Sequence, residues 1–185
     1  MRSSGYLTGL STGSDQMPFK LVKPVIDLNV RRVCTRPYHG HSHGCPNYGK
    51  KKSCPPQVPA LDHILILDRP IWAVWNAFDF AGHVGRMRNK HPKWSERQLA
   101  CCLYWQRGAR NKLATEVKKF FSETKHWAMQ RVLDCPEATG VNVTATMKAI
   151  GIELEWPPKK VAYQIALVGT MKQCSETVGQ GRLLL

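Results

Sequence analysis

The stretch that decides the fold lies at residues 95–122 and reads SERQLACCLYWQRGARNKLATEVKKFFS. Ser95 is a typical N-cap, and Gln98, three residues later, completes the pattern of a capping box. Apolar side chains then recur at the spacing of one helix face, at Leu99, Cys102, Leu103, Ala109, Leu113, Val117 and Phe120. The pattern predicts one long amphipathic helix with a basic outer face.

Short apolar stretches with strand character lie on both sides of this helix. Strands are expected within 19–33 and at 63–68, 71–80, 152–156 and 161–168. Pro24 marks the first of them as an edge strand. A short helix is expected from Asn142, its cap, to Gly151, its stop. Together these elements predict an α+β fold, a small mixed sheet with one long amphipathic helix and a cysteine-rich metal-binding loop.

The two ends of the chain differ in composition from its middle. Residues 1–17 are small, polar and rich in glycine and serine, so they are expected to form a flexible N-terminal arm. Residues 18–170 are expected to fold as a single metal-binding domain, followed by a flexible tail at 171–185. The length of 185 residues suits one domain of this kind.

Residues 34–60 hold three cysteines, three histidines, several prolines and glycines, and the basic run Lys50–Lys52. This composition favours neither regular structure nor a core, and a loop of this length needs something to hold it. The chain has seven cysteines, an odd number, and its N-terminus lacks the apolar run of a signal peptide, so a complete set of disulfides is not expected. Cys34, Cys45 and Cys54 are therefore candidate metal ligands.

Cys45, Cys54 and Cys135 each precede a proline, a pairing that recurs at the ligands of iron–sulfur clusters. Cys135 shares the loop setting of the other two and is the candidate for the fourth ligand. The expected set is thus Cys34, Cys45, Cys54 and Cys135. Their spacing matches neither the ferredoxin run nor the closer cysteine pairs of zinc fingers. Three cysteines on one irregular loop with a fourth far away nevertheless suit a cuboidal cluster, so an iron–sulfur cluster of the 4Fe–4S type is expected.

Alternatives to this assignment stay open. Histidines at 39, 41 and 43 alternate just before Cys45, and together with cysteines they could make a zinc site. Cys135 could instead be a buried free thiol, which would leave the fourth position to a histidine, to Cys101 or to substrate. Cys102 lies on the apolar stripe of the expected helix and is expected to be a core residue.

Two motifs support the metal hypothesis. The first is Cys45-Pro46-Asn47-Tyr48-Gly49 followed by Ser53-Cys54-Pro55-Pro56, and the second runs from Cys135 to Ile152. They resemble the signature of a family of small proteins catalogued as domain of unknown function 2284 and described only as predicted metal-binding. The resemblance spans residues 30–168 and implies metal binding without implying a reaction. The cysteine cluster that the family often carries before the second motif is missing here, where residues 125–134 stand.

The formal net charge of +14 favours polyanionic partners, either nucleic acid or an anionic small molecule. A positive surface is expected near the cysteine loop, formed by some of Lys50, Lys51, Lys52, Arg86, Arg88, Lys90, Arg107 and Arg110. No stretch is long and apolar enough to cross a membrane, so a cytoplasmic protein without a membrane partner is expected.

Two functions fit these observations. The first is redox or sulfur chemistry by an iron–sulfur cluster on a small-molecule or nucleotide substrate. The second is a zinc-stabilised basic module that binds nucleic acid. No catalytic residue is assigned, because the chain has no Walker loop, dinucleotide fingerprint or nucleophile elbow.

Overall fold

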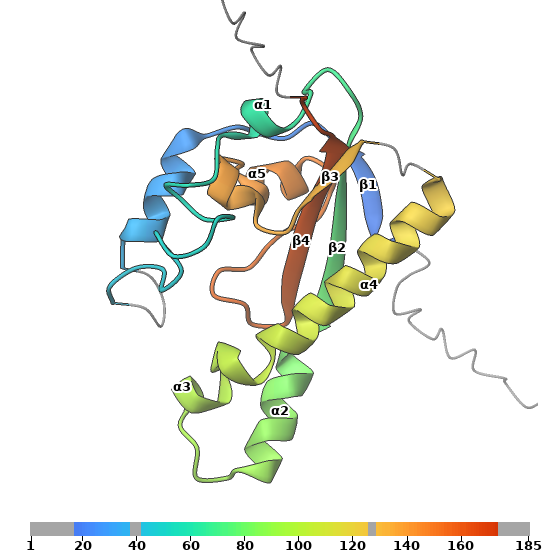
Figure 1. Cartoon of the computed structure of the whole chain (residues 1–185). Coiled ribbons are helices and arrows are strands. Elements are labelled where there is room, and N and C mark those ends of the chain that lie inside the picture. The colour runs from blue at the N-terminus through green and yellow to red at the C-terminus, as the bar shows by residue number, and fades with distance from the viewer. Residues whose placement is uncertain (1–16, 38–41, 126–128, 174–185) are drawn as a thin grey trace, which may run out of the picture.

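The computed structural model describes residues 17–37, 42–125 and 129–173 (Figure 1). The expected arm and tail lie outside the described residues, except for Met17 and residues 171–173. The elements along the chain are β1 (Phe19–Val22), the 3-10 helix η1 (Leu28–Thr35), α1 (Leu61–Ile64), β2 (Ile71–Asp79), α2 (Phe80–Lys90), α3 (Glu96–Leu99), η2 (Cys102–Tyr104), α4 (Gln106–Thr124), β3 (Gln130–Leu133), η3 (Pro136–Thr139), α5 (Val143–Lys148) and β4 (Val161–Thr170). This combination of helices with one sheet confirms the α+β fold.

The strands of the described residues form one sheet in the order β1-β2-β4-β3. β2 and β4 form its centre and pair from Ile71 opposite Gly169 to Asp79 opposite Val161. β1 lies at the edge, as Pro24 predicts. Every described pair is antiparallel, so the sheet is not the mixed sheet that was expected.

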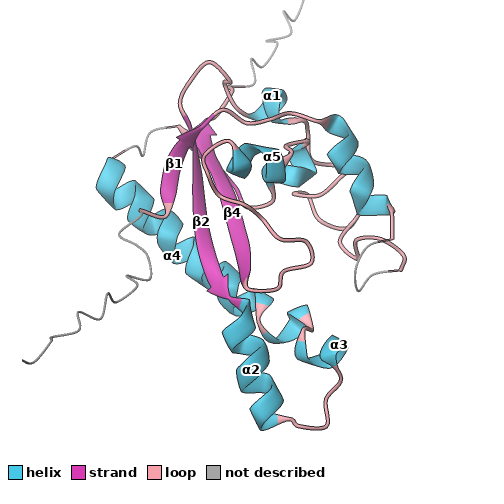
Figure 2. Cartoon of the chain, turned by 180° about the vertical axis from the view of Figure 1, so that it is seen from behind, coloured by secondary structure: helices cyan, strands magenta, loops and turns pink. Residues whose placement is uncertain are grey.

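Helices cover the two faces of the sheet, and alternate residues of β2 contact one layer or the other (Figures 1 and 2). Trp72 and Val74 belong to the core under α4, which also contains Phe120. Ala73 and Trp75 belong to the core on the opposite face, together with buried residues of α1 and α5. The cysteine segments lie on this second side, so α4 and the candidate site are separated by the sheet.

The expected helix at 95–122 is interrupted, and this prediction is corrected. Its start is confirmed: the Ser95 hydroxyl accepts from the Gln98 N–H at 3.3 Å, and the Gln98 side chain accepts from the Ser95 N–H at 2.9 Å. The helix nevertheless ends at Leu99, and α4 begins at Gln106. Trp105 accounts for the break, because its indole N–H donates to the Ala100 carbonyl and its ring stacks on Phe78 with centroids 5.2 Å apart.

Three expected strands also differ from the structure. The stretch at 28–33 is the helix η1, started by Asp27, whose carboxylate accepts from the Asn29 N–H at 3.0 Å. The stretch at 63–68 forms the end of α1 and a single bridge at Leu65, because Leu61 and Leu65 are both fully buried at helical spacing. Residues 152–156 form no strand either, because the Glu155 carboxylate there accepts two N–H groups of the turn before β4.

The remaining local signals are confirmed. The Asn142 side chain accepts from the Ala145 N–H at 2.9 Å and starts α5. Gly151 has a φ of 89°, in the left-handed region that favours glycine, and follows the end of that helix. β3 is an element that the sequence pattern missed, since only Leu133 of its four residues is buried.

His83 in α2 predicts a loss of stability in mild acid. The side chain is buried against Phe78, and within the described residues its Nε2 atom has no hydrogen-bond partner. Burial, and secondarily the Arg86 charge, lower the pKa of His83 below its ordinary value of 6.5. The unfolded chain therefore takes up this proton at a higher pH than the folded chain, and the free energy of unfolding falls as the pH drops below 6.5.

His83→Met should remove this contribution while keeping an apolar side chain in place. We expect the urea midpoint of the wild type to fall more between pH 7.5 and pH 5.5, taken as about one unit either side of the ordinary histidine pKa, than that of the variant. Identical shifts in the two proteins would contradict the prediction.

Candidate metal centre

The helix η1, which carries Cys34, is joined to the segment that carries Cys135. The Asp27 N–H donates to the Gly140 carbonyl at 2.8 Å, and the Asn142 N–H donates to the Val25 carbonyl at 2.8 Å. Gly140 has a φ of 91°, and a Cβ there would lie 2.7 Å from a side-chain carbon of Leu28. This close approach brings two segments that are far apart in the sequence into direct contact.

The loop that carries Cys45 returns to the end of the same helix. The Cys45 N–H donates to the Cys34 carbonyl at 2.8 Å. The preceding residue, Gly44, has a φ of 79°, and a Cβ at this position would lie 2.7 Å from the Cys34 carbonyl oxygen. Glycine is therefore required for the backbones of Cys34 and Cys45 to meet.

Hydrogen bonds close the part of the loop between Cys45 and Cys54. The Gly49 N–H donates to the Pro55 carbonyl at 2.9 Å, and the Gln57 amide donates to the Gly49 carbonyl at 2.9 Å. The Arg31 guanidinium of η1 donates to the Val58 carbonyl at 2.7 Å. The described part of the loop is therefore held in place by hydrogen bonds of its own.

The thiols of the loop lie close enough to influence one another. Burial raises the pKa of Cys34, and the negative charges that Cys45, Cys54 and Glu137 would carry raise it further. All three loop cysteines are half-buried and free. The structure thus brings Cys34, Cys45 and Cys54 into one neighbourhood.

Cys135 borders the same neighbourhood from η3, where it is the N-cap. Burial of its thiol among protein groups, and secondarily the Glu137 carboxylate, raise the pKa of Cys135 to about 12, and Cys54 contributes in the same direction. Protein groups thus surround the Cys135 thiol, although the residue as a whole is exposed to solvent. Burial also raises the pKa of Glu137.

Glu137 is a group of the site that the sequence patterns did not assign. It stands two residues after Cys135 and is close enough to raise the pKa values of both Cys34 and Cys135. The only sequence signal for Glu137 as a site residue is its place directly after the Cys135-Pro136 pair. Glu137 comes close to both Cys34 and Cys135 because η1 and η3 are in contact.

An open hollow of about 610 Å³ lies beside the thiols. Its wall includes Cys34 and Cys45, together with His43, Tyr48 and Lys50. His43 is thus placed beside two candidate ligands, whereas the histidines at 39 and 41 lie outside the described residues. The hollow provides space for a small molecule next to the cysteines, with one lysine for an anionic group.

The candidate ligands are of residue types that bind metals, but their side chains are not arranged around one metal position. Thiolates are the ligands of iron–sulfur clusters and of structural zinc. Among residues 17–37, 42–125 and 129–173, however, no three His, Cys, Asp or Glu side chains stand at the spacing of a coordination shell. Metal binding would therefore require the sulfur atoms to move closer together.

Other predicted residues lie elsewhere in the molecule. Cys102, expected in the core, is half-buried in η2 and packs against the edge of the core formed by Phe80 and Trp105. Cys101 begins η2 next to it. The arginines and the lysine of α2 and of the start of α4 lie at the end of the molecule formed by α2 and α3, away from the cysteine loop that carries Lys50–Lys52 (Figure 1). Of the residues expected to form a basic surface, Lys50, Lys51 and Lys52 are exposed on the cysteine loop itself.

Fold and site together define a small α+β protein in which the backbones of Cys34 and Cys45 meet on one side of an antiparallel sheet. Comparison with family models, curated proteins and solved structures finds no match for the chain. The resemblance to the metal-binding family therefore stays a prediction. No helix in the described part of the chain has the length and apolar character needed to span a membrane.

Proposed function

We propose that this protein binds a metal centre through Cys34, Cys45 and Cys54, with Cys135 as the fourth ligand, and that the centre is an iron–sulfur cluster. The observation that supports the proposal is the hydrogen bond between the backbones of Cys34 and Cys45, together with the position of Cys54, which is close enough to Cys34 and to Cys135 to raise the pKa of each. All four are free thiols, as metal-ligating cysteines must be. The motifs that resemble those of the predicted metal-binding family are in line with this proposal.

The surrounding residues suit a centre that acts on a substrate. A bound cluster would supply electron transfer or an open iron for sulfur chemistry. The hollow beside Cys34 and Cys45 would admit a small molecule or nucleotide, and Lys50 on its wall would hold an anionic group of that substrate. Tyr48 would offer a ring and a hydroxyl for further contact.

Zinc is the second candidate, and the position of His43 favours it. This histidine lies on the wall of the same hollow as Cys34 and Cys45. Zinc is commonly held by mixed cysteine and histidine ligands. In that case the metal would be structural and would stabilise a basic module for nucleic acid.

Anaerobic purification and reconstitution with iron and sulfide should distinguish these proposals. We expect a brown protein with a broad visible absorption that disappears on oxidation, and with iron and inorganic sulfide in equal amounts. A colourless protein that retains zinc would establish the second candidate instead. If the protein retained neither metal beyond the amount in a variant with Cys34, Cys45 and Cys54 all changed to serine, the proposal would be wrong.

Cys135→Ser tests the fourth ligand. We expect less metal per chain than in the wild type, yet more than after loss of a loop cysteine, because three thiolates can still hold a cluster with one iron open. Cys101→Ser is the matched control, since this half-exposed cysteine lies outside the site. Full occupancy and unchanged absorption in Cys135→Ser would show that another group takes the fourth position.

A further inference from the structure

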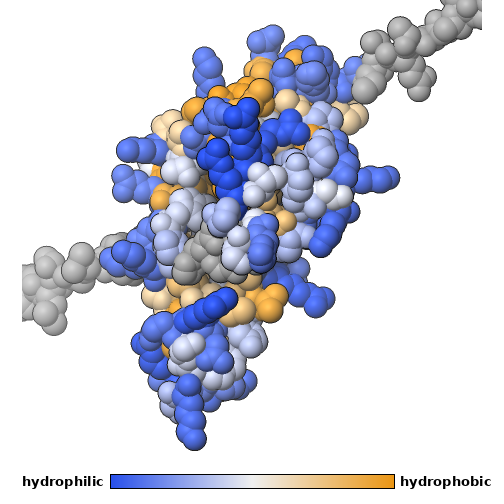
Figure 3. All heavy atoms as spheres, turned by 90° about the vertical axis from the view of Figure 1, so that its left-hand side faces the viewer, coloured by the Kyte–Doolittle hydropathy of each residue, from blue (hydrophilic) through white to orange (hydrophobic). Residues whose placement is uncertain are grey.

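A second region with its own chemistry lies at the end of the molecule formed by α2, α3, η2 and the start of α4, residues 80–112, called here the helical lobe. Its exposed charged side chains are eight basic residues and one acidic residue. The basic residues are Arg86, Arg88, Lys90, Lys93, Arg97, Arg107, Arg110 and Lys112. In Figure 3 hydrophilic residues gather over this lower end of the molecule, below an orange hydrophobic patch.

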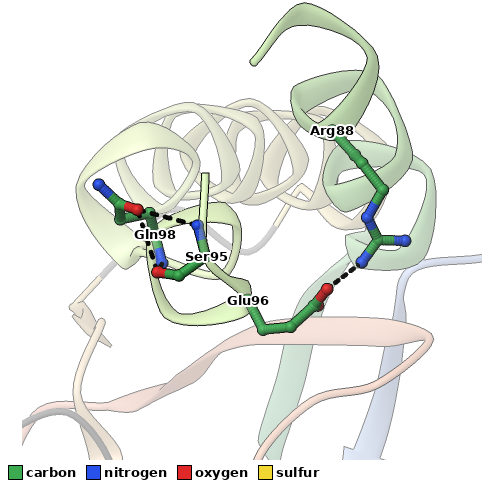
Figure 4. A network of polar contacts seen from close by, with 4 residues as sticks. All are labelled: Arg88, Ser95, Glu96 and Gln98. Carbon is green, nitrogen blue, oxygen red and sulfur yellow. Dashed lines mark hydrogen bonds and ion pairs between the residues drawn. The ribbon is translucent and has the colours of Figure 1, made fainter. Parts of the chain in front are cut away.

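The single acidic residue of the helical lobe is paired within it. Arg88 of α2 donates to the Glu96 carboxylate of α3 at 2.6 Å, next to the capping box formed by Ser95 and Gln98 (Figure 4). This ion pair links the two helices. It also partly neutralises the Glu96 carboxylate, and Arg86 lies 3.8 Å from the carboxylate of Asp79, the N-cap of α2, so both carboxylates that could repel a polyanion here have a basic partner.

Aromatic rings form a stack on the surface of the same lobe. His91 and Trp94 lie with centroids 3.9 Å apart and planes inclined by 7°, and Tyr104 follows Trp94 at 5.0 Å. Tyr104 is 54% exposed, and the neighbouring Leu103 is 83% exposed. These rings are not part of the core of the lobe, which is filled by Phe80 and Trp105.

We propose that the helical lobe binds single-stranded nucleic acid, with a base stacked on the exposed ring of Tyr104, which Trp94 supports from within, and phosphates held by the surrounding arginines and lysines. Exposed aromatic faces next to basic side chains are the combination that single-stranded polynucleotides require, because their unstacked bases offer a free face. A duplex offers no such face along its length, and an acidic protein would need only the charges. This inference goes beyond the proposed metal centre and uses none of its residues.

Fluorescence anisotropy with a labelled oligonucleotide of about twelve nucleotides tests the proposal on the full-length protein. We expect the wild type to bind oligo-dT or oligo-U at low salt, with affinity falling steeply as salt rises. Tyr104→Ala should weaken binding roughly tenfold, whereas Tyr104→Phe should keep it, since the ring remains. Arg107→Gln and Arg110→Gln should reduce the steepness of the salt dependence, by about 0.7 for each phosphate that the protein no longer neutralises.

Matched controls separate the lobe from the general basic charge of the chain. Trp156→Ala removes an aromatic that is 69% exposed outside the lobe, and Lys159→Gln with Lys160→Gln removes two exposed charges there. These variants should bind like the wild type. The proposal is overturned if Tyr104→Ala binds as well as the wild type, if a duplex of equal length binds as tightly, or if poly-glutamate competes as well as unlabelled oligonucleotide.

Discussion

Cys45→Ser is expected to abolish most metal binding. Its sulfur is one of three in the cysteine loop, and its backbone N–H is bonded to Cys34, so the loss falls at the centre of the proposed ligand set. Substitutions of groups that only contact metal ligands weaken metal affinity roughly 10- to 100-fold, and loss of a ligand itself should cost more. We expect metal per chain after anaerobic reconstitution to fall to a small fraction of the wild-type value.

Thermal unfolding provides a second readout for the same substitution. A metal that binds only the folded chain raises the apparent melting temperature. Added metal should therefore raise this temperature in the wild type and leave Cys45→Ser almost unaffected. Cys102→Ser serves as the control, because it changes a cysteine that packs in the helical lobe. If Cys45→Ser retained wild-type metal content, the loop would not hold the centre.

Phe120→Ala is expected to lower the free energy of unfolding by about 3–5 kcal/mol, the range found when a buried phenylalanine is removed from a core. The side chain is fully buried between α4 and the sheet, and its ring meets those of Phe19 at 5.1 Å and Trp72 at 5.6 Å. Small domains are stable by about 5–15 kcal/mol, so this single change should remove a large part of the total.

Urea unfolding at neutral pH measures this loss. Lys118→Ala is the matched control on the same helix, because its side chain is exposed and should change the free energy of unfolding by no more than about 0.5 kcal/mol. A Phe120→Ala variant that unfolds at the same urea concentration as Lys118→Ala would show that α4 is not packed on the sheet as described.

Local signals in the sequence predicted the elements that depend on local chemistry. The Ser95 capping box, the Asn142 cap and the central strands at 71–79 and 161–170 all appear in the structure. Tertiary packing overrode the pattern elsewhere. The apolar stripe continues past Leu99, but burial of Trp105 breaks the helix there.

The residue types of the candidate site could be predicted from the sequence, but the way in which distant residues come together there could not. Three cysteines within 34–54 indicate a site by their density alone. The proximity of Cys135 depends on backbone hydrogen bonds between residues 25–27 and 140–142, which no side-chain pattern encodes. Glu137 enters the site through the same contacts. The stacked rings of His91 and Trp94 come from one turn, closed by the Trp94 N–H to His91 carbonyl bond, whereas Tyr104 comes from η2, and no sequence pattern places it beside them.

The pairing of β2 with β4 has a consequence for how the protein is made. The ribosome delivers the chain from the N-terminus, so β2 and its buried residues Val74 and Trp75 emerge well before β4, their central partner, exists. The cysteine loop also emerges before Cys135. A metal that arrived during synthesis would therefore meet the three loop cysteines before Cys135, which itself emerges before β4.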